Sequence, residues 1–396
     1  MSHPSFDATP SLLGYLYQLR LGLLVALEKS REVGDIDNCT VTIETIDDLS
    51  VEDCSISTEL IQSKHHLSKG NLTDKSPDIW KTLRVWCENI SNQLSFLERL
   101  PLLTLLSTET VVEGSLAACL SANKLMRNET EALRLLREIA DKGGNKANEE
   151  AYKAFSNLDV DQQVRLVSCI YISSDAPNIL DVENEIAKHL RLSVSATNLQ
   201  AFTSRVEGVW FKWSIDAMVK DGPNSINLAE FIRTLESLSK EYSPKSLPAE
   251  YEDISTDEFV TSESEKLYIQ QLKQLPVTER MLKTAIKNCV KAKRQRSSWH
   301  RQGLLLPGEL KKYEDKIFEE WEMHFDHIQM TQCHLPLENQ GSSVYMQCQT
   351  NGLKRIRPQF DGDYVARGTY HILADEARIG WHPQYEVIFG FDKGKE

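Results

Sequence analysis

The sequence lacks the features of membrane and secreted proteins. No apolar run approaches the ~20 residues that span a bilayer. The N-terminus, MSHPSFDATP, has no basic segment followed by an apolar one, so it does not resemble a secretory signal. The eight cysteines are scattered without a CxxC pair, which is typical of reduced thiols rather than of a disulfide framework. These absences predict a cytoplasmic protein with no membrane segment.

Nucleotide-binding loops are absent as well. The chain has no GxxxxGKS or GxxxxGKT loop and no GxGxxG unit, so we expect it to bind neither ATP nor a dinucleotide. An ATPase that acts with it is therefore expected to be a partner. The formal net charge of −13 excludes a generally basic surface. Any contact with DNA is expected from local basic patches and from a metal ion.

The first 112 of the 396 residues have the pattern of an α/β unit. Leucines at three- and four-residue spacing predict a helix over Ser11–Glu32, and Pro77–Arg99 predicts a second helix. Leu102–Leu106 is typical of a buried strand. Two further β-type runs, Val41–Glu44 and Glu59–Lys64, lie between the helices.

The rest of the chain is predicted to be mainly helical. We divide it into a helical middle region, 113–248, and a helical C-terminal region for partner docking or regulation, 249–396. An acidic stretch with prolines near this boundary, Ser243–Glu265, predicts a solvated hinge. Periodicity leaves Val164–Ile172 open as a strand or a buried helix. Helices are expected at Leu116–Met126, Glu129–Lys142, Glu149–Leu158, Val182–Leu192, Leu199–Val219, Lys266–Gln274, Thr278–Trp299 and Glu309–His327.

The two β-type runs carry a set of polar side chains. Because side chains alternate between the faces of a strand, Gln62 and Lys64 share one face, as do Thr42 and Glu44. An acidic corner, Asp47–Asp48, lies between the runs. If the strands lie side by side, one sheet edge is expected to gather Glu44, Asp48, Gln62 and Lys64.

These side chains suit phosphodiester hydrolysis. That reaction uses a metal ion that neutralises phosphate oxygens and lowers the pKa of a bound water. Mg²⁺ (or Mn²⁺) takes oxygen ligands and keeps several waters, so one or two carboxylates suffice. We expect Glu44, Asp48 and Gln62 to bind the metal ion, and Asp47 is an alternative to Asp48 as a ligand. Lys64 is expected to orient the attacking water or to meet charge developing on the phosphate; the alternative is a solvated lysine on a surface strand.

The spacing D-x13-Q-x-K from Asp48 to Lys64 resembles the PD-(D/E)xK nuclease superfamily, with glutamine in place of the usual acid. Four segments are similar to the double-stranded DNA endonuclease domain of bacterial anti-phage effectors: GYLYQ (Gly14–Gln18), IETIDD (Ile43–Asp48), LIQSKH (Leu60–His65) and DIWKTL (Asp78–Leu83). The chain as a whole resembles the nuclease subunit of Lamassu systems, also called ABC three-component systems.

This resemblance implies a restriction-endonuclease-like domain followed by a larger, mainly helical region. It also implies metal-dependent cleavage of double-stranded DNA, with catalytic roles for Asp48, Gln62, Lys64 and Glu44. The partners that it implies are an SMC-like ATPase and a small middle subunit, which would restrain the nuclease until activation. We further expect self-assembly on activation, because cutting both strands needs two active sites close together.

Other polar residues allow weaker hypotheses. His65 follows the lysine and is a candidate for contact with DNA or a partner, although facing solvent is the simpler interpretation. The densest basic cluster is a second candidate for contact with DNA or a partner, against the alternative of a solvated helix face. Its members are Lys287, Lys291, Lys293, Arg294, Arg296 and Arg301. A zinc site is conceivable from His324, His327, Cys333, His334 and Cys348, but their spacing matches no established motif.

Two alternative functions remain open. The chain is then either a nuclease effector gated by a signalling cyclic oligonucleotide, with a sensor after residue 150, or a scaffold that binds DNA ends without cutting them. Binding of cyclic oligonucleotides would distinguish the first, and DNA binding without cleavage the second.

Overall fold

A computed structural model describes residues 9–32, 36–44, 47–54, 56–66, 70–92, 100–219, 225–255, 257–351 and 353–390. The chain divides into two compact units. Unit 1 comprises Met1–Leu192 and Thr203–Glu236, and unit 2 comprises Ser193–Phe202 and Ser237–Glu396. No helix within the described ranges has both the length and the apolar composition needed to cross a bilayer.

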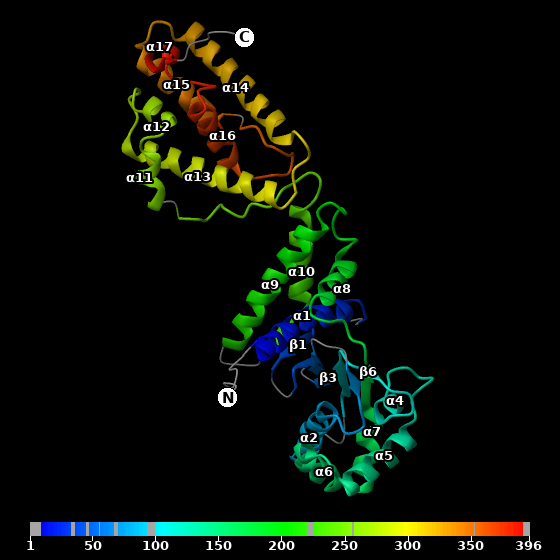
Figure 1. Ribbon diagram of the computed structural model, residues 1–396. Helices are drawn as coiled ribbons and strands as arrows, with labels where there is room; N and C mark the ends of the chain where they lie inside the picture. Colours follow the sequence, from blue (N-terminus) through cyan, green and yellow to red (C-terminus); the bar gives the residue numbers. More distant parts are fainter. Residues whose placement is uncertain are drawn as a thin grey trace. The chain divides into compact units, whose positions relative to one another are not determined.

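Unit 1 is built around a six-stranded sheet, in which Figure 1 labels β1 and β3. The strand order is β7-β5-β3-β2-β1-β8. Strands β1, β2 and β3 form an antiparallel meander; β5 runs parallel to β3, β7 runs parallel to β5, and β8 is antiparallel to β1. The short strands β4 and β6 pair separately. The bounds are β1 (Cys39–Ile43), β2 (Leu49–Asp53), β3 (Ile56–Lys64), β4 (Asn71–Leu72), β5 (Leu102–Ser107), β6 (Thr110–Val111), β7 (Ile170–Ser173) and β8 (Ser225–Asn227).

Helices cover both faces of this sheet. Leu60 of β3 belongs to a buried apolar cluster with Trp80 of α2, which defines the α2 face. Leu49, which pairs with Ile61, lies on the opposite, α1 face. There a Cβ on Gly22 would lie 3.2 Å from Leu49 Cδ2, so helix and sheet approach closely. The helices are α1 (Thr9–Glu32), α2 (Pro77–Asn92), α4 (Leu116–Cys119), α5 (Glu129–Lys142), α6 (Glu149–Ser156), α7 (Val160–Cys169), α8 (Asp181–Leu190), α9 (Leu199–Val219) and α10 (Leu228–Glu241).

Unit 2 is helical in its described residues and centres on the pair α13 (Glu279–Arg301) and α16 (Asp363–Asp375). A Cβ on Gly368 of α16 would lie 2.2 Å from the main-chain oxygen of Asn288 on α13, so the two helices touch at this glycine. The buried indole of Trp299 donates a hydrogen bond to the Pro248 carbonyl (2.8 Å). The other helices are α11 (Val260–Glu263), α12 (Leu267–Leu272), α14 (Glu309–Thr331), α15 (Leu337–Thr350) and α17 (Tyr385–Phe389).

The predicted class, a mixed α/β unit followed by a mainly helical region, is confirmed. The predicted helices Glu129–Lys142 and Leu199–Val219 coincide with α5 and α9. The ambiguous run Val164–Ile172 contains both alternatives, because the end of α7 leads directly into β7. The middle region, 113–248, contributes two strands, β7 and β8, to the sheet.

Two local predictions need correction. The β-type runs at Val41 and Glu59 are not neighbours, because the overlooked strand β2 lies between β1 and β3. The helix expected over Leu116–Met126 ends at Cys119 as α4. The second predicted helix, Pro77–Arg99, corresponds to α2 over Pro77–Asn92, and the rest of its predicted span, 93–99, lies outside the described residues.

Candidate functional site

The acidic corner occupies the turn between β1 and β2. Ile43 at the end of β1 pairs with Leu49 at the start of β2, and the turn lies between them. Within the turn the Glu44 N–H donates to the Asp48 carbonyl (3.0 Å). Glu44 has a φ of +53°, which lies outside the strand region. The expectation that Glu44 continues the strand on the face of Thr42 is therefore wrong, although it stays beside Asp48.

Asp48 is held by β3. Its buried carboxylate accepts hydrogen bonds from the Gln62 side-chain amide, from the Ser63 N–H (2.7 Å) and from the Ser63 hydroxyl (2.8 Å). The predicted neighbours Asp48 and Gln62 thus meet, across the β2–β3 pairing rather than between β1 and β3. Ser63 was not identified from the sequence; its only signal is its place between Gln62 and Lys64.

Asp47 points to α2. Its Oδ2 accepts a hydrogen bond from the indole of Trp86 (2.6 Å), and its Oδ1 is buried with no hydrogen-bond partner among the described residues. Burial raises the pKa of Asp47 to about 7, and the nearby negative charge of Asp48 adds to the rise; the Trp86 hydrogen bond opposes it. The turn therefore holds one carboxylate fully hydrogen-bonded and another with a vacant oxygen.

Lys64 interacts electrostatically with acidic residues of the turn. Its charge lowers the pKa of Glu44 and of Asp47, against the desolvation that raises both. The Thr108 N–H donates to the Lys64 carbonyl (3.2 Å), which fixes the end of β3 to the end of β5. Glu44, Asp48, Gln62 and Lys64 consequently gather at one end of the sheet.

The two histidines after Lys64 lie on opposite faces. The His65 ring packs on Tyr17 of α1, with 4.7 Å between centroids, and its Nε2 accepts from the Ile179 N–H (3.4 Å). Burial lowers the pKa of His65, and the positive charge of His66 lowers it further. His65 thus faces the α1 layer, away from the face of Gln62 and Lys64, and its role in contact with DNA stays a prediction.

Most of the basic cluster is engaged within unit 2. Lys291 is buried and donates to the Glu252 carbonyl. The other partners are acidic: Glu263 and Asp375 for Lys293, Glu258 for Arg294, and Glu314 for Arg296. Lys287 is exposed. Little of the cluster's charge is therefore available to a phosphate backbone, and binding of DNA or a partner by these residues stays a prediction.

The candidate zinc residues do not converge in the described part of the chain. Cys348 is buried and Cys333 is exposed, whereas His324 lies 3.5 Å from Glu320. Within the described ranges, one group of three histidine, cysteine or carboxylate side chains brings its ligand atoms within 4.8 Å of one another. It consists of His66, Asp78 and Glu109, of which the sequence analysis named none as a metal ligand.

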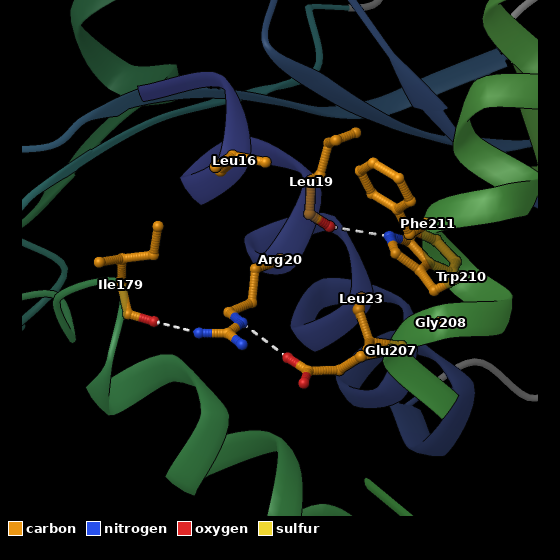
Figure 2. A pocket seen from close by; sticks show the side chains of 9 residues that line it. All are labelled: Leu16, Leu19, Arg20, Leu23, Ile179, Glu207, Gly208, Trp210 and Phe211. Atoms are coloured by element: carbon orange, nitrogen blue, oxygen red, sulfur yellow. Dashed lines mark hydrogen bonds and ion pairs between the residues drawn. The ribbon is translucent and has the colours of Figure 1, made fainter. Parts of the chain in front are cut away.

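Unit 1 also contains a cavity of about 410 Å³ between α1 and α9 (Figure 2). Leu16, Leu19, Leu23 and Phe211 make its lining largely apolar. Its arginine, Arg20, donates to Glu207 (2.6 Å) and to the Ile179 carbonyl (2.7 Å), as Figure 2 shows. The charges are thus paired within the cavity wall, and none of the predicted site residues lines it.

One comparison with known proteins gives a match. Residues 268–389, which include most of the helices of unit 2, match the family described as C-terminal domain 7 of the ABC-three component (ABC-3C) systems. This match supports membership of the chain in an ABC-three component system. No curated protein and no solved structure matches the chain significantly.

Proposed function

We propose that this chain is the nuclease subunit of a Lamassu-type ABC-three component defence system and cleaves double-stranded DNA with a bound Mg²⁺ or Mn²⁺. The observation that carries the proposal is the contact of Asp48 with Gln62, with Lys64 two residues further along the same face of β3. An aspartate, a lysine and a glutamine in place of the usual acid of the motif are thereby brought together at one end of the sheet.

The topology supports the same proposal. In the described residues α1, β1, β2, β3, α2 and β5 follow one another, with the short strand β4, which lies outside the six-stranded sheet, between β3 and α2; β5 is parallel to β3. This order corresponds to the α-β-β-β-α-β order of the PD-(D/E)xK nuclease core. In this arrangement the acidic residue precedes the second strand and the amide and lysine lie on the third strand. Asp48, Gln62 and Lys64 occupy these positions.

The side chains fit a hard divalent cation. The vacant, buried Oδ1 of Asp47 and the carboxylates of Asp48 and Glu44 offer the oxygen ligands that Mg²⁺ prefers. The Gln62 amide, a donor to Asp48 here, also has an oxygen that can accept a cation. Glu44, Asp47 and Asp48 do not bring three ligand atoms within 4.8 Å of one another, so at most two of these carboxylates would bind one ion as they lie, and water would occupy the other positions. A bound cation would lower the pKa of a coordinated water and would place positive charge next to the phosphate oxygens.

Lys64 has the chemical role that no carboxylate can fill. Its ammonium group can donate hydrogen bonds to the attacking water or to the phosphate oxygens as charge develops on them. Lys64 is half-buried, so water screens its charge less than that of a fully exposed lysine. Weaker screening strengthens these interactions.

Partner subunits follow from the domain match. A C-terminal domain of the ABC-three component class is what would dock this chain onto an SMC-like ATPase and a small middle subunit. The same partners would restrain the nuclease until activation, in the cytoplasm where DNA is accessible. Activation would then bring two copies together for a double-strand cut.

A non-catalytic, DNA-end-binding scaffold is the second candidate. One observation favours it: three protein donors already occupy the Asp48 carboxylate. The deciding experiment incubates supercoiled plasmid with the purified chain, alone and with its operon neighbours, in Mg²⁺ or in EDTA. We expect Mg²⁺-dependent linear and degraded products; DNA binding without any cleavage in both preparations would instead favour the scaffold.

A further inference from the structure

The end of β3 carries a second cluster of potential ligands. Side chains on the same face recur every two residues, so His66 follows Gln62 and Lys64 on the α2 face. His66 Nε2 lies 2.6 Å from Asp78 Oδ2 in the first turn of α2. Glu109, in the turn between β5 and β6, brings a carboxylate oxygen within 4.8 Å of both ligand atoms.

Three different segments hold these side chains in place. The His66 N–H donates to the Thr108 hydroxyl (2.9 Å), which ties the end of β3 to the residue before Glu109. The Glu109 N–H donates to the Ser107 hydroxyl (3.2 Å). The Glu109 carboxylate lies against Gly70, where a Cβ would come within 2.5 Å of Oε1. The absence of a side chain at position 70 leaves the space that this carboxylate occupies.

The charges of the cluster are unbalanced. Two carboxylates share one imidazole, and within the described ranges neither Asp78 nor Glu109 forms an ion pair with a lysine or arginine. Even with His66 protonated, one negative charge is left over. The His66 side chain keeps 41% of its surface exposed and that of Asp78 keeps 19%, so an ion from solvent can reach the cluster.

We propose that His66, Asp78 and Glu109 form a second divalent-cation site, separate from the one around Asp48. One imidazole nitrogen and two carboxylate oxygens suit a divalent first-row transition ion such as Mn²⁺ or Zn²⁺, with water in the remaining positions. The ion ties the end of β3 to α2 and to the β5–β6 turn, and it places positive charge two residues beyond Lys64. The site exists whether or not the chain cuts DNA.

Mn²⁺ binding to the full chain tests this proposal, because Mn²⁺ prefers oxygen and nitrogen ligands and avoids the exposed thiols. Free Mn²⁺ is followed by its electron paramagnetic resonance signal during titration of metal-free protein. We expect Glu109→Gln and His66→Gln to weaken this binding event by at least about tenfold. Glu320→Gln is the matched control, since Glu320 contacts His324 without a third ligand and its loss should leave Mn²⁺ binding unchanged.

Asp48→Asn separates this proposal from the nuclease proposal. Loss of one Mn²⁺ in Asp48→Asn and of another in Glu109→Gln supports both sites. An effect in Glu109→Gln alone supports the second site and counts against the first. If Glu109→Gln and His66→Gln, with unfolding midpoints like that of the wild type in EDTA, bind Mn²⁺ as tightly as the wild type, the cluster is a histidine–carboxylate ion pair and the proposal is overturned.

Discussion

The indole of Trp86 donates a hydrogen bond to the Asp47 carboxylate at 2.6 Å, across 39 positions of the sequence. This contact joins the middle of α2 to the turn that precedes β2, and both groups are buried. It positions Asp47 beside Asp48 and fixes the helix that covers the site. The packing of α2 and the geometry of the acidic corner therefore depend on each other.

Trp86→Phe is expected to destabilise the folded state by about 1–3 kcal/mol, because the buried Asp47 carboxylate loses the hydrogen bond from the indole. Urea unfolding of Trp86→Phe, Asp47→Asn and the double variant measures the coupling directly. We expect the double variant to lose less stability than the sum of the single losses. Additive losses would show that the hydrogen bond contributes nothing to stability.

Asp47 is expected to make stability depend on pH. Burial raises its folded-state pKa to about 7, above its value in the unfolded chain, so the folded state binds this proton more tightly. The free energy of unfolding therefore falls as the pH rises from about 4 to about 7, by at most about 1.4 kcal/mol per pH unit. The asparagine in Asp47→Asn cannot ionise and avoids this loss.

The free energy of unfolding of both proteins, measured in EDTA from pH 5 to pH 8, checks this expectation. The stability of Asp47→Asn relative to the wild type should increase with pH and level off above about 7. Parallel curves over this range would mean that the Asp47 carboxyl is already ionised in the folded protein at pH 5.

Ser63→Ala removes one of the three donors to Asp48 and leaves the main-chain donor in place. We expect a loss of about 0.5–1.5 kcal/mol in the free energy of unfolding, the usual contribution of one hydrogen bond. Ser50→Ala on the neighbouring strand is a suitable control, because the hydrogen bond of that buried hydroxyl to Glu52 is long, at 3.4 Å. An equal effect of both substitutions would argue against a special role for Ser63.

Gly368→Ala tests the close contact between α13 and α16 in unit 2. Its methyl group would lie 2.2 Å from the Asn288 carbonyl oxygen, so α13 and α16 must separate, at a cost of about 1–3 kcal/mol. Gly14→Ala in α1 is the control, since no atom lies within 4 Å of its Cβ position, and it should be neutral or stabilising. Thermal unfolding of both variants compares the two; an undiminished midpoint for Gly368→Ala would contradict the close packing.

Periodicity gave the helices because their apolar stripes are long. The twenty-four residues of α1 and the fourteen of α5 contain several repeats of the helical pattern. Strand β2 has only five residues, Leu49–Asp53, and directly follows the two aspartates of the turn. Its apolar alternation, Leu49 and Val51, was present but too short to separate from the acidic corner.

The site was predictable where it depends on local spacing. The two-residue offset of Gln62 and Lys64 fixes their shared face before any tertiary structure is known. The contacts of Asp47 with Trp86 and of His66 with Asp78 and Glu109 depend instead on how α2 and the β5–β6 turn pack on the sheet. Residues far apart in the sequence meet there, and no local pattern specifies that meeting.

The most direct measurement of the central claim is plasmid cleavage by Lys64→Ala in Mg²⁺, alongside the wild type and Lys81→Ala, which removes an exposed lysine of α2. All three proteins are tested alone and with the partner subunits, at matched concentration and after their folded state has been verified by thermal unfolding. We expect Lys64→Ala to cleave at least about 10²-fold more slowly, whereas Lys81→Ala should keep the wild-type rate. Cleavage by Lys64→Ala at the wild-type rate would show that Lys64 has no part in the reaction.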